Sequence, residues 1–245
     1  MQADFFSLRA AVSAIFLVAL AGAAPPALAQ ADARAAETAG GASATSAQKH
    51  IDAAADVVRR MTADPGLSQL IAQSKGVYIL PRYGRAALGL GASGGAGVFL
   101  AHMPDGSWSQ PAFFNTGGIS IGLQAGAEGG PVTLIMRNTK ADSSFREKNS
   151  FNLSADAGFT VAKWSRDKAG EAGASDIVAW SGSEGLFGNV ATLAINDVHF
   201  NRRANQAYYG KAVSAQDVLS GTVSNAQADG LRKALSAAVV HEGGL

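Results

Sequence analysis

Apolar and polar residues alternate along two stretches in the middle of the chain. Between Ile119 and Glu128 every second residue is apolar, and the same period-two pattern runs from Phe151 to Val161. Successive side chains of a strand point to opposite faces, so the alternation predicts strands with one buried face. Shorter apolar runs bounded by Gly, Pro or Asn predict further buried strands at 77–80, 98–100, 132–136 and 177–180.

Helical periodicity is found on both sides of these strands. A helix beginning near Ser46 has an apolar face formed by Ile51, Ala54, Ala55, Val58 and Met61. Asp64 and Pro65 supply a cap and a first-turn proline for a second short helix ending near Ser74. Towards the end of the chain, two pairs have the spacing of capping boxes, Ser214 with Asp217 and Ser224 with Gln227, and the second precedes the helical positions Ala228, Leu231, Leu235 and Val239.

The short spacing between the predicted strands decides the fold class. Most of the intervals have no room for a crossover helix, so the strands are expected to pair mainly antiparallel. We therefore expect an α+β fold with a mainly antiparallel sheet core, as a sandwich or partial barrel, bracketed by N- and C-terminal helices.

The first residues indicate export. An apolar run from Ala10 to Ala24 is followed by two prolines and by Ala27-Leu28-Ala29, the small-residue pattern of a cleavage site. We expect residues 1–29 to be a signal peptide and residues 30–45, rich in Ala, Thr, Ser and Gly, to be a flexible linker. The folded domain is then 46–245, and the mature protein is expected to be periplasmic or envelope-associated.

Composition narrows the function. The chain has no cysteine, which excludes lipoprotein anchoring at a cysteine, a thiol nucleophile and thiolate metal sites. A net charge of +1 gives no overall attraction to nucleic acid. The four histidines form no recognised metal-ligand spacing with Asp or Glu. We expect no cofactor, no metal and no nucleic-acid partner.

Two enzyme-like motifs occur in one glycine-rich segment. Gly89, Gly91 and Gly94 have the G-x-G-x-x-G spacing of dinucleotide-binding proteins, and Ser93 is at the centre of a G-x-S-x-G sequence. Both motifs require a strand-to-helix turn, whereas a second apolar strand pattern follows here. A Ser93 hydrolase assisted by Asp197 and His199 is a minor alternative, and we expect a glycine-rich strand without catalytic function.

Several blocks of the sequence resemble the SYLF domain family. They are 76–81, the glycine-rich 89–98, the most specific block 108–113, then 119–126, 134–136, 181–188 and 205–210. The family is found in bacterial envelope proteins and in eukaryotic proteins that bind phosphoinositides and, in fungi, actin. The resemblance implies a lipid-binding function for an exported bacterial member. It also implies an amphipathic N-terminal helix that meets the membrane, here Ser46 to Met61.

A peripheral lipid-binding protein needs an apolar surface and cations for phosphate headgroups. The leading candidates are three residues around the first strand, Lys75, Arg82 and Arg85. Others flank the first helix (Lys49, Arg59 and Arg60) or follow residue 161 (Lys163, Arg166 and Lys168). Such charges are often only solvated, and an apolar helix stripe often packs on its own sheet.

The sequence therefore predicts a non-catalytic module that binds acidic phospholipid or phosphoinositide-like headgroups peripherally at the envelope. The alternative is a structural or partner-binding envelope protein with no lipid ligand, which uses a sheet edge to bind another chain. The sequence leaves open the headgroup preference, the oligomeric state, the cellular process, and whether the N-terminal helix meets the membrane or packs on the sheet.

Overall fold

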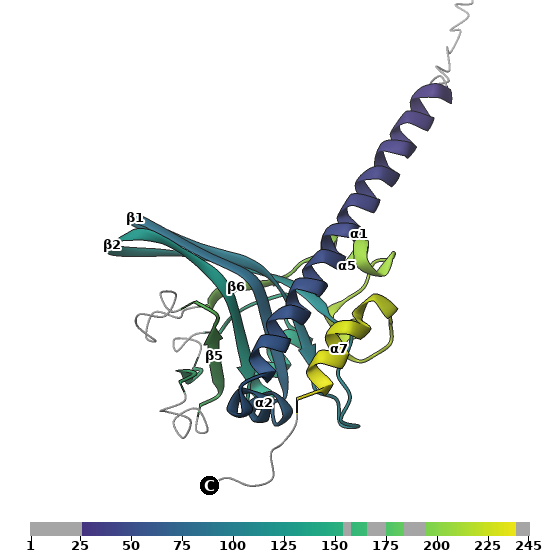
Figure 1. Cartoon of the computed structure of the whole chain (residues 1–245). Helices are drawn as coiled ribbons and strands as arrows, with labels where there is room; N and C mark the ends of the chain where they lie inside the picture. Colours follow the sequence, from purple (N-terminus) through teal and green to yellow (C-terminus); the bar gives the residue numbers. More distant parts are fainter. Residues whose placement is uncertain (1–25, 154–157, 166–174, 184–194, 239–245) are drawn as a thin grey trace, which may run out of the picture. The chain divides into compact units, whose positions relative to one another are not determined.

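A computed structural model describes residues 26–153, 158–165, 175–183 and 195–238 (Figure 1). For 26–40, 42, 85–91, 119–128 and 195–196 the description covers the backbone alone. The chain divides into two compact units, Met1–Thr38 and Ala39–Leu245, and both hydrophobic cores belong to the second unit. Helix α1 spans Pro26–Thr62. Residues 30–45 are therefore helical and not the flexible linker we expected, consistent with the high helix propensity of their many alanines.

The remaining elements alternate between short helices and strands. In chain order they are α2 (Pro65–Ala72), β1 (Gly76–Ala101), β2 (Ala112–Met136), α3 (Thr139–Glu147), β3 (Ser150–Leu153), β4 (Val161–Lys163), β5 (Ile177–Ser181), β6 (Ile195–Phe200), α5 (Arg202–Tyr209), α6 (Ala215–Leu219), the 3-10 helix η5 (Ala226–Ala228) and α7 (Asp229–Ser236). The α+β class and the helices before and after the sheet are confirmed.

Strand β2 organises the sheet. Strand β1 pairs with it antiparallel along nearly its whole length. On the opposite edge of β2, β6 pairs near its start and β5 near its end, both antiparallel. Strand β3 extends the sheet beyond β6, and β4 beyond β5 in the only parallel pairing among the described strands. The predicted mainly antiparallel core is confirmed.

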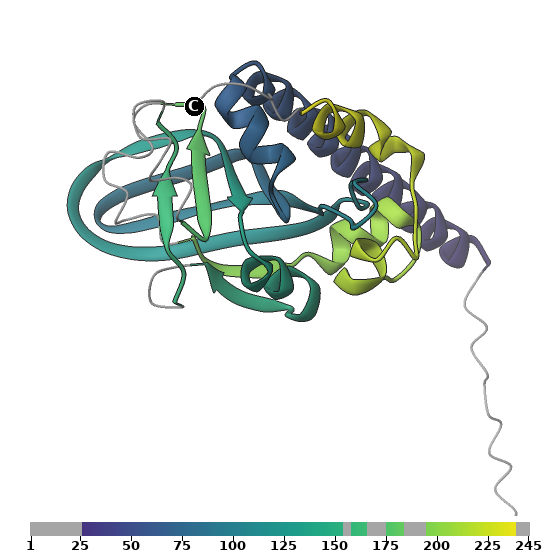
Figure 2. The same cartoon turned by 90° about the horizontal axis from the view of Figure 1, so that it is seen from below.

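Strand β1 doubles back on itself, so the apolar runs 77–80 and 98–100 form two limbs of one strand. A Cβ atom on Gly76 would lie 2.5 Å from the Phe99 ring, and one on Gly97 would lie 2.5 Å from the Tyr78 ring. Each aromatic ring thus covers a glycine on the other limb, a known way of stabilising glycine within a sheet. Figure 2 shows β1 and β2 bending together, which gives the curled sheet of a partial barrel.

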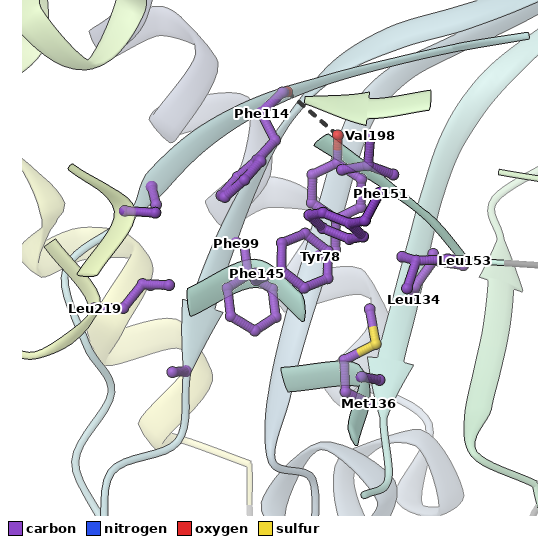
Figure 3. Close-up of a cluster of buried hydrophobic side chains, with 14 of the residues drawn as sticks. Tyr78, Phe99, Phe114, Leu134, Met136, Phe145, Phe151, Leu153, Val198 and Leu219 are labelled. Atoms are coloured by element: carbon purple, nitrogen blue, oxygen red, sulfur yellow. Dashed lines mark hydrogen bonds between the residues drawn. The ribbon is translucent and has the colours of Figure 1, made fainter. Parts of the chain in front are cut away.

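Successive side chains of the strands point to opposite faces of the sheet and pack in two separate hydrophobic cores. Tyr78, Phe99, Phe114 and Leu134 face the first core, which also contains Phe145 of α3 (Figure 3). The intervening strand residues face the second core: Val77, Ile79, Val98, Leu100, Phe113, Ile135 and Val178. Burial on both faces explains why these strands read as continuous apolar runs.

The apolar face of α1 belongs to the second core. Ile51, Ala54, Val58 and Met61 are each at most 1 % exposed. They pack in one cluster with β1, α2 and α7 residues. The expectation that this face of Ser46 to Met61 meets a membrane is therefore wrong for the folded protein, because the sheet already covers it. Among the described residues, no helix has the length and hydropathy needed to cross a bilayer.

The helix caps that the sequence predicted are only partly confirmed. Asp64 caps α2, and Ser214 with Asp217 forms a complete capping box on α6, as predicted. The expected capping box at Ser224 and Gln227 is wrong, because the Asn225 side chain caps η5 and no side chain caps α7.

The expected single strand 151–161 is also wrong. Its described residues include the end of β3, the left-handed Gly158 and the start of β4. Val239, Arg166 and Lys168 lie outside the described residues.

Candidate functional site

A pocket of about 400 Å³ lies within the unit Ala39–Leu245. Its floor is the paired strands β1 and β2, where Ala96 lies opposite Asn115 and Gly97 opposite Phe114. Helix α1 and the start of α5 form its walls. The lining residues are Ser43, Ser46, Ala47, His50, Ala96, Gly97, Phe113, Phe114, Asn115, Asn201, Arg203 and Ala204.

The α1 wall follows from helical spacing. Ser43, Ala47 and His50 are separated by four and three residues, so they share one face of the helix. Ala47 is buried, which brings the helix backbone close to the strands. The sequence therefore places a histidine, small side chains and hydroxyl groups against the sheet at this point.

The α5 wall is held by Asn205, which is fully buried. Its side-chain amide donates to the Phe113 carbonyl at 2.9 Å and to the Asn201 carbonyl at 2.8 Å, and its side-chain oxygen accepts from the Phe113 amide at 3.0 Å. Asn201 caps α5 through the Ala204 amide and donates to the Asn115 side chain at 3.1 Å. This network fixes the start of α5 on β2, and with it the position of Arg203.

His50 is the titratable group of the pocket. Its ring centroid lies 6.3 Å from that of Phe113, and its Nε2 atom is buried without a hydrogen-bond partner. Burial lowers the pKa of His50 to about 4, the positive charge of Arg82 acts in the same direction, and hydrogen bonding to the Ala96 backbone opposes both. The imidazole is therefore neutral at pH 7.

Two arginines reach this region from different elements. Arg203 is exposed and lines the pocket from α5. Arg82 lies on the other limb of β1, beside Gly95, where its carbonyl oxygen would be 2.6 Å from a Cβ on that glycine. Gly95 directly precedes the pocket residue Ala96, and the positive charge of Arg82 is one of the causes that lower the pKa of His50. Arg82 was a sequence candidate, whereas Arg203 was not.

The other predicted cations do not join one patch. Lys75 precedes β1, and seven residues of extended strand, about 20 Å, separate it from Arg82. Arg85 lies in β1 with its backbone paired to Glu128. Lys49 is exposed on α1, about 15 Å of helix away from Arg59. Arg59 forms an ion pair with Asp56, and Arg60 donates to the Asp56 carbonyl.

The features that would support catalysis are not assembled in the described part of the chain. Ser93 is within β1 and pairs with Gly118, so it does not lie at a strand-to-helix turn. His199 contacts the Asp197 carbonyl at 3.1 Å, a local interaction within β6. In the described ranges, no three His, Asp or Glu side chains are grouped to hold a metal ion.

Comparison with known proteins gives a consistent family. The family described as "Ysc84: Las17-binding protein actin regulator" matches residues 117–238, which include the α5 wall of the pocket. The human protein "SH3 domain-containing YSC84-like protein 1" is 27 % identical over 172 residues, which cover 69 % of this chain and 50 % of that protein. In Saccharomyces cerevisiae, "Protein YSC84" is 29 % identical and "LAS seventeen-binding protein 3" is 28 % identical, each over 134 residues. Each alignment covers 53 % of this chain, and the two cover 28 % of Protein YSC84 and 29 % of LAS seventeen-binding protein 3. The chain thus spans about half the length of the mammalian relatives and less of the yeast ones.

Proposed function

Because this chain belongs to the SYLF domain family, we propose that it is a non-catalytic module that binds acidic phospholipid at a membrane surface. The observation that carries the proposal is a largely apolar pocket that is lined by Arg203 and has Arg82 beside its floor. Guanidinium groups bind phosphate oxygens in a planar, two-pronged geometry, and each cation near an anionic leaflet contributes about 1 kcal/mol.

The surface that meets lipid differs from the one first expected. The apolar stripe of α1 is enclosed in the second core, so it is not available to the membrane without unfolding. Lipid contact then depends on the polar residues and cations around the pocket. This favours headgroup recognition over insertion of a helix.

Export through residues 1–29 is part of the proposal, with periplasmic or envelope lipid as the ligand. The test is the mass of the mature protein recovered from the producing cell. Cleavage after Ala29 supports export, and an intact N-terminus on protein found only inside the cell contradicts it.

Vesicle co-sedimentation tests lipid binding directly. The full chain and residues 30–245 are compared on neutral and anionic vesicles at low and high salt, so that any contribution of the first residues is measured separately. The proposal predicts that both bind anionic vesicles and that salt weakens binding, because mobile ions screen exposed charges. Equal binding to neutral vesicles, or no binding to either, contradicts it.

A protein partner is the second candidate function. The matching family is described as a Las17-binding actin regulator, and one yeast relative is named for binding to LAS seventeen. We propose this function for the present chain only as the alternative to lipid. Cross-linking in the producing cell that traps one defined protein, with no retention on anionic vesicles, favours it.

A further inference from the structure

The pocket has two chemically different linings. Ala47, Phe113 and Ala204 offer apolar surface, whereas Ser46, Asn115 and Asn201 offer hydroxyl and amide groups. Its volume of about 400 Å³ is within the range of pockets that hold small-molecule ligands. A ligand that satisfies both linings has an apolar part and a polar end.

The charges near the pocket indicate the sign of the polar end. Arg203 lines the pocket and Arg82 lies beside its floor. No Asp or Glu is among the lining residues. An anionic group is therefore favoured there over a cationic one.

The buried Nε2 atom of His50 adds a second, independent indication of a ligand. A buried polar atom without a partner costs about 1–3 kcal/mol, and a hydrogen bond from a ligand would remove this cost. The imidazole is neutral at pH 7, so one of its nitrogens donates and the other accepts. Because hydrogen bonding to the Ala96 backbone uses the ring N–H, Nε2 is the acceptor and suits a headgroup that carries a hydroxyl group, such as a singly protonated phosphate.

We propose that the pocket binds one molecule of a single-chain anionic amphiphile. Its alkyl chain lies against Ala47 and Phe113, and its anionic group lies between Arg82 and Arg203. This inference rests on the proposed lipid-binding function and adds to it a saturable site for a single molecule, distinct from adsorption to a charged surface.

Calorimetric titration of the full chain with decyl phosphate, below its critical micelle concentration, tests the site. Inorganic phosphate and decyl maltoside supply the anion and the alkyl chain separately. The proposal predicts one molecule bound per chain and at least tenfold weaker binding of each partial ligand. Equal affinity for inorganic phosphate would reduce the site to an anion site and overturn the proposal, as would equal affinity for decyl maltoside.

Two matched pairs of variants locate the binding. Ala96→Leu fills the pocket from an exposed strand position, and Ala92→Leu makes the same change at an exposed position of the same strand outside the lining. Arg203→Gln removes a lining cation, and Arg202→Gln removes its exposed neighbour. We expect Ala96→Leu to weaken decyl phosphate binding at least tenfold and Arg203→Gln about fivefold, with each control within twofold of the parent protein. Equal effects within both pairs would overturn the proposal.

The same proteins separate this inference from the proposed function. Binding to anionic vesicles without stoichiometric decyl phosphate binding overturns the pocket site and leaves the proposed function intact. Stoichiometric decyl phosphate binding that Ala96→Leu abolishes, without vesicle binding, supports the pocket site and contradicts peripheral membrane binding.

Discussion

The ring of Tyr78 covers Gly97. These two residues belong to the same strand, β1, but are nineteen positions apart in the sequence. A Cβ atom on Gly97 would lie 2.5 Å from Cε2 of Tyr78 and 2.9 Å from the Ile79 carbonyl oxygen. Tyr78 is fully buried, and its hydroxyl group donates to the Phe114 carbonyl at 3.2 Å. This contact holds the two limbs of β1 together, and Gly97 is itself part of the pocket floor.

Gly97→Ala is expected to destabilise the fold by about 1–3 kcal/mol, because a methyl group has no space beneath the Tyr78 ring. Urea unfolding measures the change in the free energy of unfolding. Gly230→Ala in α7 is the matched control. A Cβ there would meet nothing within 4 Å, so the better helix propensity of alanine should stabilise by about 0.5–1 kcal/mol. An unchanged free energy of unfolding for Gly97→Ala would contradict the close approach of Gly97 to the Tyr78 ring.

Asn205→Ala should destabilise the protein by about 2–4 kcal/mol, because it removes three hydrogen bonds and takes from the buried Phe113 amide its side-chain acceptor, while the Phe113 carbonyl keeps the Asn201 amide as a donor. Gln206→Ala changes an exposed neighbour on the same helix and should stay within about 0.5 kcal/mol of the parent protein. Thermal and urea unfolding of both variants test this. Similar stabilities for the two would show that the Asn205 network does not fasten α5 to the sheet.

The pKa of His50 predicts an acid sensitivity with a definite sign. His50 titrates near 6.5 in the unfolded chain and near 4 in the folded protein. Between these values the unfolded state binds more protons, so the free energy of unfolding falls as pH drops from 6.5 towards 4. At 1.36 kcal/mol per pKa unit, the loss approaches roughly 3 kcal/mol.

His50→Gln removes this titration and keeps the neighbouring Arg82 and Arg203. Unfolding measured at pH 7 and pH 4.5 should therefore show a smaller loss in the variant than in the parent protein. An equal loss would assign the acid sensitivity to other groups.

The burial of the apolar face of α1 leads to a further prediction. Ile51 is 1 % exposed, so Ile51→Ala should cost about 2–4 kcal/mol, whereas Asp52→Ala on the exposed face should cost under about 1 kcal/mol. A helix whose apolar face met a membrane would show little effect of either change on the stability of the protein in water. Urea unfolding without lipid distinguishes these cases.

Local patterns in the sequence predicted the elements well where one interaction decides the structure. The helical spacing of Ile51, Val58 and Met61 correctly predicted a helix and its buried face, and Asp64 correctly predicted the start of α2. The strand patterns were also informative about burial. They did not show that 77–80 and 98–100 are limbs of one strand, because a bend set by aromatic rings over distant glycines has no local signature.

The pocket was harder to predict because its residues come from four elements that are distant in the sequence. Arg82 was proposed from its closeness in sequence to Lys75, yet an extended strand carries the two side chains far apart. Arg203 was missed. The adjacent cations Arg202 and Arg203 were the available signal, but only the structure shows that Arg203 lines the pocket.

The measurement that tests the account most directly is anionic vesicle binding by two matched double variants. Arg82→Gln with Arg203→Gln removes the cations at the pocket, and Lys75→Gln with Arg202→Gln removes the same charge elsewhere on the surface. At about 1 kcal/mol per cation, we expect the first to weaken binding by roughly 25-fold and the second by less than fivefold. Equal weakening by both variants would contradict a headgroup site at the pocket and would leave only non-specific attraction between a charged surface and the membrane.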